Sequence, residues 1–295
     1  MIRVGTAGWS YPDWEGVVYP KGAAGSSDAL PLLVRMFDTL EINVSFYRPP
    51  SPRMSQSWAR RVSTRPTFRF TAKLWQGFTH ARGEEHAAEE RSFKEGMRPL
   101  VEAGLLGALL AQFPHSFKDN HDNRDYLDNL IERFAAYPLV VELRHISWMG
   151  GDFLSTLDER GVGFCNVDQP VFSSSAHPST VMTGKVGYVR LHGRNKAEWF
   201  RKAAGRDARY DYLYSHEEIR EWADRIRLMQ GKSRAGADVF IIANNHYRGQ
   251  APANALELMN LLTGESVEIP ESLMKAFPHL APMAAKTHRP GMLPL

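Results

Sequence analysis

The segment LDNLIERFAAYPLVVELR, residues 127–144, contains a helix pattern followed directly by a strand pattern. The apolar residues of its first half recur at three-to-four spacing: Leu127, Leu130, Ile131 and Phe134. This spacing places them on one face of an amphipathic helix. The second half, centred on Val141, is a short apolar run that is typical of a strand. The segment therefore predicts one helix-and-strand unit of an α/β protein.

The same kind of unit recurs along the whole chain of 295 residues. Eight strand-like runs are centred near Val4, Ile42, Phe70, Leu109, Val141, Asn166, Val189 and Ile241. Their mean spacing is about 34 residues, the length of one strand-plus-helix unit. Alternating strands and helices indicate a parallel sheet with right-handed crossovers, either open and doubly wound or closed as a barrel. Eight units favour closure, so we expect an α/β fold of the TIM-type (β/α)8 barrel class.

Two connections and the C-terminus depart from this regular pattern. The sixth crossover, between Asp168 and Tyr188, is rich in Ser, Thr, Gly and Pro, and we expect little or no helix there. The seventh is long, and its helix opens with Ser215 and Glu218 at the spacing of a capping box. Residues 265–295 contain five prolines and suit an extension packed on the barrel exterior or frayed at its end. With no linker to divide it, residues 1–295 are predicted to form a single domain.

The composition excludes several classes of protein. With 43% hydrophobic, 11% aromatic and 23% charged residues, the chain is typical of a globular protein, which excludes disorder, collagen and coiled coil. A net charge of +3 is too small to indicate a nucleic-acid partner by itself. The single cysteine, Cys165, precludes an intrachain disulfide, and no leader or membrane-spanning run is apparent. We expect a cytoplasmic protein without a membrane partner.

Polar side chains alternate with apolar ones where several predicted strands end. The pattern appears as Glu41-Ile42-Asn43, Glu142-Leu143-Arg144, Asn166-Val167-Asp168 and Arg190-Leu191-His192. Because residues i and i+2 of a strand share a face, and helices cover the outside of a barrel, we expect each polar pair in the lumen. The same alternation would turn Cys165 towards the helices. Lys73, Gln112 and Asn244 end other strands, so a polar pocket is predicted at the C-terminal mouth.

These charges have a purely structural alternative. Glu142, Arg144, Asp168 and Arg190 would then form an internal ion-pair network that only holds the barrel together. Because buried charge is a poor way to gain stability, we favour a binding or catalytic site.

Longer motifs resemble the YecE-like family, Domain of Unknown Function 72. They are GTAGWSYPDWEGVVYP at 5–20, LEINVSFYRPP at 40–50, FRFTAKLWQGFTH at 68–80, LLAQFP at 109–114, VELRHISW at 141–148, YVRLHGR at 188–194 and ANNHYRGQAPANA at 243–255. The motifs follow the family's order over nearly the whole chain. The resemblance implies a TIM-type barrel but no activity, because the family is named for lacking one. This chain departs from the family at Ala243, where a phenylalanine usually precedes the two asparagines.

A divalent metal is a further alternative for the pocket. Residues of the types that bind metals lie on neighbouring predicted strands: Glu142, His145, Asp168 and His192. However, the chain has no HxH or HxxxH pair, and Arg144, Arg190 and Lys73 compete for the same carboxylates. A metal is therefore not favoured.

A basic loop follows the seventh predicted strand. Between residues 190 and 209 the chain has Arg190, Arg194, Lys196, Arg201, Lys202, Arg206 and Arg209 against Glu198 and Asp207, a local net charge of +5. A loop in this position lies over the mouth, where it would attract a phosphate-bearing ligand, and the alternative is a solvated loop. Tyr210, Tyr212 and Tyr214 offer surfaces for stacking on unpaired bases.

We therefore predict that the barrel binds an anionic, phosphate-containing ligand at its mouth, with hydrolase or lyase-type acid/base chemistry. The roles are Glu142 and Asp168 as acid/base groups, His192 as a proton carrier, Lys73, Arg144, Arg190 and Arg194 as anion clamps, and Glu41, Asn43 and Asn244 as orienting groups. One alternative is a non-catalytic nucleic-acid-binding barrel that uses the basic loop. Another is a glycoside hydrolase in which Glu41 and Glu142 flank the scissile bond.

Overall fold

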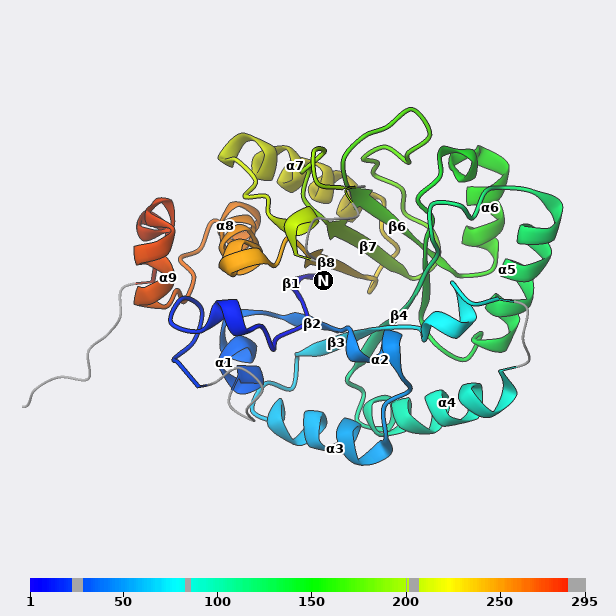
Figure 1. Ribbon diagram of the computed structural model, residues 1–295, viewed down its shortest axis with the longest axis horizontal. Helices are drawn as coiled ribbons and strands as arrows, with labels where there is room; N and C mark the ends of the chain where they lie inside the picture. The colour runs from blue at the N-terminus through cyan, green and yellow to red at the C-terminus, as the bar shows by residue number, and fades with distance from the viewer. Residues whose placement is uncertain (23–28, 83–85, 200, 202–206, 286–295) are drawn as a thin grey trace, which may run out of the picture.

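Eight parallel strands close into a barrel in the computed structural model, in which β1 pairs with both β2 and β8 (Figure 1). The structure describes residues 1–22, 29–82, 86–199, 201 and 207–285. The strands are β1 (Ile2–Ala7), β2 (Thr39–Ile42), β3 (Arg69–Lys73), β4 (Leu106–Gln112), β5 (Leu139–Glu142), β6 (Gly163–Asp168), β7 (Val186–Leu191) and β8 (Asp238–Ala243). Each contains one of the eight predicted strand centres. The predicted TIM-type barrel is confirmed.

Helices surround the barrel and cover the outer faces of the strands (Figure 1). They are α1 (Ala29–Met36), α2 (Val44–Tyr47), α3 (Pro52–Arg61), α4 (Ala87–Glu102), α5 (His121–Arg133), α6 (Gly151–Glu159), α7 (His216–Lys232), α8 (Gln250–Thr263) and α9 (Glu271–Ala276). The predicted capping box is present at the start of α7, where the side chains of Ser215 and Glu218 each accept a backbone N–H of the other. None of the helices in the described ranges is long and apolar enough to cross a membrane.

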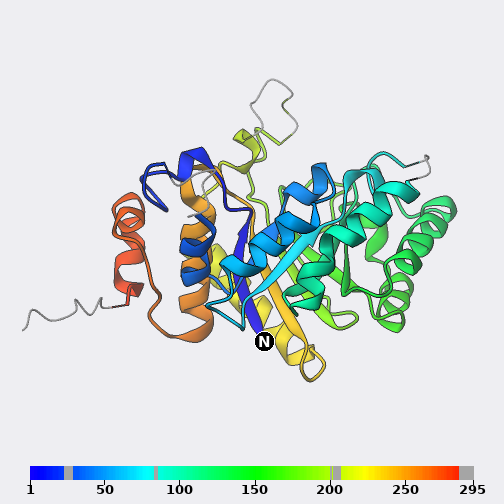
Figure 2. The same cartoon turned by 90° about the horizontal axis from the view of Figure 1, so that it is seen from below.

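The irregular connections also match the sequence pattern. Residues 169–185 connect β6 to β7 without a helix, as expected. The extension after α8 includes α9 and places the buried side chains of Leu273 and Leu280 against the body of the protein. Figure 2 shows α9 outside α8, with the start of β1 at the opposite end of the barrel from the segment that precedes α7.

The sheet separates two apolar layers. A small cluster fills the lumen and includes Ala108, Val140, Cys165 and Phe240. The larger cluster lies between strands and helices. Because the lumen is filled by these side chains over its lower part, a ligand can be held only at the end where the polar side chains lie.

The side chains of β6 point to the opposite faces of the sheet from those predicted. β6 pairs with β7 so that Cys165 lies beside Tyr188, and both side chains belong to the lumen cluster. Asn166 and Asp168 therefore point outward, towards the helices. The prediction was wrong because alternation establishes which residues share a face, but not which face is the lumen.

Candidate functional site

A buried ion triad crosses the lumen below the mouth. Arg190 on β7 donates from Nη1 to Glu142 Oε2 and from Nη2 to Glu41 Oε1, each at 2.7 Å. The three side chains are at most 2% exposed. Although burial opposes their charge, the two carboxylates raise the pKa of Arg190 well above its ordinary value. Burial likewise opposes the charge of Glu142, but Arg190 and Arg144 hold its pKa well below the usual range, so that both groups stay ionised.

The same geometry removes the glycoside hydrolase alternative. The guanidinium of Arg190 occupies the space between Glu41 and Glu142 and bonds to both. The remaining oxygen of Glu41 accepts a hydrogen bond from the Tyr188 hydroxyl at 3.0 Å. A glycosidic bond therefore cannot lie between these carboxylates, as the two-carboxylate mechanism requires.

Arg144 and His192 complete the polar layer around Glu142. Arg144 donates from Nε to Glu142 Oε1 at 2.7 Å, and its side chain is 18% exposed. His192 is completely buried, with Nδ1 2.9 Å from the amide of Asn244 and Nε2 3.4 Å from Glu142 Oε1. Burial, reinforced by the two arginines, lowers the pKa of His192 to about 3. The imidazole is therefore neutral at pH 7 and lies against Glu142.

A cavity of about 980 Å³ opens above this layer, at the C-terminal ends of the strands. The polar side chains on its floor include Asn43, Lys73, Gln112, Arg144, Arg190 and Asn244, and Asp207 and Arg209 also line it. Its aromatic lining consists of Trp9, Tyr11, Phe46, Tyr47, Trp58 and Tyr210. The cavity thus combines cationic and amide groups with flat apolar walls, the combination expected of a site for an organic anion.

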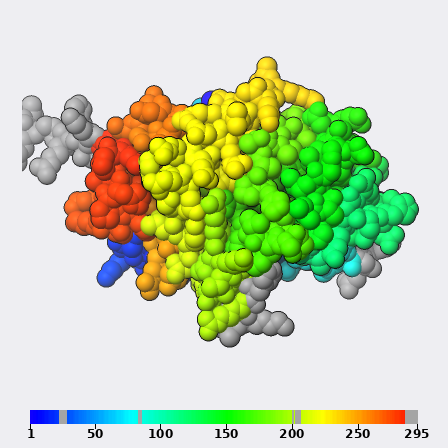
Figure 3. All heavy atoms as spheres, turned by 90° about the horizontal axis from the view of Figure 1, so that it is seen from above, coloured from blue at the N-terminus to red at the C-terminus, as the bar shows by residue number. Residues whose placement is uncertain are grey.

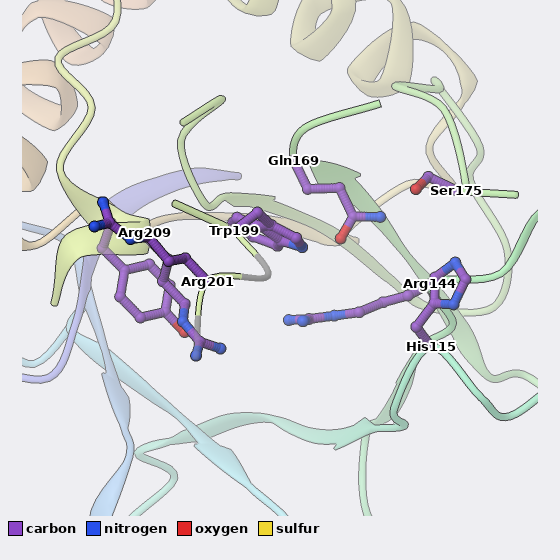
Figure 4. A pocket seen from close by; sticks show the side chains of 8 residues that line it. His115, Arg144, Gln169, Ser175, Trp199, Arg201 and Arg209 are labelled. Atoms are coloured by element: carbon purple, nitrogen blue, oxygen red, sulfur yellow. The ribbon is translucent and has the colours of Figure 1, made fainter. Parts of the chain in front are cut away.

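A second hollow of about 270 Å³ adjoins the first and shares Arg144, His115, Arg209 and Tyr210 with it. Figure 4 shows Arg144 extending from the side of His115 towards Arg201 and Arg209 on the other side. The guanidinium of Arg144 therefore faces space on two sides while one carboxylate holds its Nε edge.

Lys73 lies on the cavity floor beside the two arginines. It is the last residue of β3, its side chain is 9% exposed, and Nζ lies 3.9 Å from the centre of the Phe46 ring. Burial and the nearby Arg190 lower the pKa of Lys73 to about 7, against the opposing effect of Glu41 and Glu142. Its charge therefore changes near neutral pH, whereas the arginines keep theirs.

Asp168 and Arg194, two of the predicted site residues, lie outside the lumen. The Asp168 carboxylate faces α7 and accepts hydrogen bonds from Arg194 Nε and Nη2, the Tyr214 hydroxyl and Trp222 Nε1. Arg194 also bonds to Glu218 at 2.7 Å. Strand alternation would have placed Arg194 in the lumen, but Gly193 has a φ of +87° and turns the chain outward. Both residues stabilise the packing of the segment before α7 and do not face the cavity.

The structure brings the other predicted residues together. They are Glu41, Asn43, Lys73, Glu142, Arg144, Arg190, His192 and Asn244. Three of these, Glu41, Glu142 and His192, lie beneath the cavity surface and act on it through Arg190, Arg144 and Asn244.

The basic loop carries less free charge than its composition indicates. Arg190 and Arg194 are paired with carboxylates, and Arg201 pairs with Glu198 at 3.0 Å. Lys202 and Arg206 lie outside the described residues. Figure 3 shows the segment before α7, in yellow-green, protruding from the edge of the molecule.

The three tyrosines after this loop do not form one stacking surface. Tyr214 is buried against Asp168, and Tyr212 donates to Glu218 at 2.7 Å. Of the three, Tyr210 lines the cavity. The expected platform for unpaired bases is therefore wrong for Tyr214.

Comparison with known proteins agrees with the fold and the motifs. The family model described as "Protein of unknown function DUF72" matches residues 3–278. The chain belongs to the DUF72 family. The UPF0759 protein YunF of Bacillus subtilis (strain 168) is 30% identical over 276 residues, which cover 89% of this chain and 95% of that protein.

Crystal structures of DUF72 proteins share the barrel. The DUF72 protein of Thermotoga maritima MSB8 is 35% identical, with a TM-score of 0.78, over 89% of this chain and 99% of its own. A DUF72 protein of Enterococcus faecalis V583 is 27% identical, with a TM-score of 0.79, over 91% of this chain and 97% of its own. These relatives establish the family and the fold, and their names state no activity.

Several cavity residues of this DUF72 protein were missed by sequence reasoning. His80 and His115 come from the loops after β3 and β4, and Phe46 comes from the short α2. The available signal was position, because loops that follow barrel strands build the mouth. By contrast, Trp14 and Trp148 are completely buried and do not line the cavity.

The described part of the chain contains no group of three or more His, Cys, Asp and Glu side chains that could hold a metal ion. Of the predicted ligands, Asp168 lies on the outer side of β6, away from Glu142 and His192, and Glu142 is bonded to two arginines. The predicted ligands therefore do not converge on one point in the described ranges.

Proposed function

We propose that this protein is an enzyme that binds a small organic anion, a phosphate ester of a ring-shaped or planar compound, in the mouth cavity. The observation that carries the proposal is the surplus of positive charge on the cavity floor. Arg144, Arg190 and Arg209 line the cavity together with Lys73, against one acidic side chain, Asp207, in its lining. The carboxylates of Glu41 and Glu142 are already engaged beneath it. Arginine pairs well with phosphate oxygens, and the aromatic walls favour a flat organic group.

Acid/base chemistry on this anion would come from groups that face the cavity. Lys73 is one such group, and His80 is another, since burial together with Lys73 and Arg144 lowers the pKa of His80 to about 4. Both offer an uncharged nitrogen at neutral pH. Glu142 and His192 then have the role of orienting Arg144 and Arg190, and the amides of Asn43 and Asn244 orient the ligand.

Binding of a matched ligand pair tests the anion site. Titration calorimetry should show that ribose 5-phosphate binds, whereas ribose does not. Arg144→Met should weaken phosphate-ester binding at least tenfold, about 1.4 kcal/mol or more, the usual effect of losing a charged hydrogen bond. Arg160→Met is the matched control, because Arg160 pairs with Asp128 on the outer helices.

Equal binding of charged and uncharged partners, or equal affinities of the two variants, would contradict the anion site. Consumption of the bound ester can be followed by phosphorus NMR. If no member of a panel of phosphate esters is consumed after it binds, the protein is a binding protein and not an enzyme.

A further inference from the structure

Lys73 differs from the other charged groups of the lumen because it lacks an acidic partner in the described part of the chain. The carboxylates nearest to it are bonded to Arg190 and Arg144. The contact made by Nζ is with the face of the Phe46 ring, at 3.9 Å. A buried ammonium without a counter-ion is costly, and Arg190 and Arg144 together already neutralise the two lumen carboxylates. Lys73 is therefore not needed to balance charge.

The surrounding chain holds this amine at the cavity surface. Ser45 is buried and donates from Oγ to the carbonyl oxygen of Lys73 at 2.7 Å. This bond ties α2 to the end of β3, and α2 carries the Phe46 ring beneath the amine. Lys73 lines the cavity together with Asn43 and Gln112, whose neutral amides can donate to an oxygen atom of a ligand.

The groups around Lys73 keep its amine uncharged in about half of the molecules at neutral pH. It is faced by Glu41 on β2, Glu142 and Arg144 at the end of β5, Arg190 on β7, and His80 in the loop after β3. Burial and the guanidiniums outweigh the carboxylates and lower the pKa of Lys73 to about 7. About half of the molecules then carry a neutral amine at pH 7, about a thousandfold more than for an ordinary lysine.

We propose that Lys73 is a nucleophile that forms an imine with a carbonyl group of the anion bound in the cavity. This inference rests on the proposed anion site and names its substrate class, an aldehyde or ketone that also carries a phosphate or carboxylate group. The Nζ lone pair attacks the carbonyl carbon, and the proton lost by nitrogen passes to the carbonyl oxygen. Loss of that hydroxyl group and the second amine proton as water leaves the C=N bond. The step involves no oxidation or reduction.

The arrangement divides binding and reaction between different cations. Arg144 and Arg190 remain charged at every physiological pH and can hold the anionic group. Lys73 can lose its proton and react with a carbonyl carbon held beside it. A methionine at position 73 would fill the same space against Phe46 without burying a charge, so packing alone does not account for lysine here.

Reductive trapping tests the proposal directly on the wild-type protein. The probe is pyridoxal 5′-phosphate, an aldehyde with a phosphate ester on an aromatic ring, followed by borohydride and peptide mapping by mass spectrometry. At pH 7 we expect the label to concentrate at Lys73, with half-maximal labelling near that pH. Lys275, which is exposed and paired with Glu271, is the internal reference and should gain label only at much higher pH.

Two variants show whether the labelled peptide contains Lys73. Lys73→Met should lose the labelled peptide, and Lys94→Met, whose lysine pairs with Glu90 on α4, should keep it. Label at Lys73 no stronger than at Lys275 at pH 7 would overturn the proposal. The wild-type map gives this answer even if Lys73→Met does not fold.

A second probe separates this proposal from the anion site. 5′-Deoxypyridoxal has the same aldehyde but no phosphate. If both proposals hold, the phosphorylated probe labels Lys73 at least tenfold faster, and inorganic phosphate protects Lys73. If phosphate esters bind by calorimetry but Lys73 is never labelled, the nucleophile proposal fails alone. If both probes label Lys73 equally and phosphate gives no protection, the anion site fails while the reactive amine stands.

Discussion

Replacing Arg190 by methionine tests the energetics of the lumen. The substitution keeps most of the side-chain volume but removes the cation that Glu41 and Glu142 share at 2.7 Å each. Removing one partner of a buried ion pair costs about 3–5 kcal/mol because the remaining charge is left without compensation. For a protein of this size the same cost lowers the melting temperature by roughly 10 °C at pH 7.

The cost should depend on pH in a defined direction. In the wild type, Arg190 and Arg144 hold the pKa of Glu142 below its unfolded value, so this stabilisation is present above about pH 4.3 and is lost at lower pH. Without Arg190, burial opposes the charge of Glu142 with less compensation and raises its pKa, and stability falls as the pH rises past about 4.3. The difference between the two proteins therefore grows from pH 4.5 to pH 7.

Urea unfolding followed by tryptophan fluorescence at pH 4.5, 5.5 and 7 measures this difference. Arg160→Met is again the control, since Arg160 forms a partly exposed pair with Asp128. Adding Glu41→Gln and Glu142→Gln to Arg190→Met should recover most of the lost stability. A loss below about 1 kcal/mol at pH 7, or the same loss at all three pH values, would refute a compensated ion triad.

Three other substitutions give distinct signatures. Asp168→Asn should lower the free energy of unfolding by about 3 kcal/mol, because its four donors surround a buried carboxylate, yet leave phosphate-ester affinity unchanged, as calorimetry would show. His192→Gln should make the free energy of unfolding depend less on pH in the acid range, as urea unfolding would show. Because the folded pKa of His192 is about 3, the wild type loses up to about 1.4 kcal/mol of stability per pH unit below pH 6.5. Lys73→Met should raise the free energy of unfolding by about 2–4 kcal/mol at pH 7, and the gain should shrink towards pH 10 as the unfolded lysine also loses its proton.

The barrel could be predicted from the sequence because its signals are local and repeated. Helical spacing such as that in residues 127–134, followed by a short apolar run, needs no knowledge of distant contacts. Convergence of the polar strand ends also followed from topology, since parallel strands of a closed barrel end at the same mouth. This placed Glu41, Lys73, Glu142 and Arg190 together.

The face of the sheet to which an individual side chain points could not be predicted in the same way. The triplet ending in Asp168 looks like the one ending in Arg144, yet the two lie on opposite sides of the sheet. What distinguishes them is the partner available outside the barrel: Trp222 and Tyr214 of the α7 region supply donors to Asp168. Such partners are 46 and 54 residues away in sequence and become visible only in the fold.

The structural and functional interpretations of the charged lumen are therefore not alternatives. Glu41 and Glu142 hold Arg190 in an otherwise apolar interior, and Arg190 in turn lowers the pKa of Lys73. Removing the carboxylates would leave a cation without compensation, and removing the cation would favour an ammonium at Lys73 that cannot react with a carbonyl. Together with Arg144, the ion triad contains two cations and two carboxylates, so its charges balance, whereas the charge of Lys73 at the cavity surface has no acidic partner among the described residues. A lysine at this cost is what the proposed reactive amine requires, whereas stability alone would favour an uncharged side chain at this position.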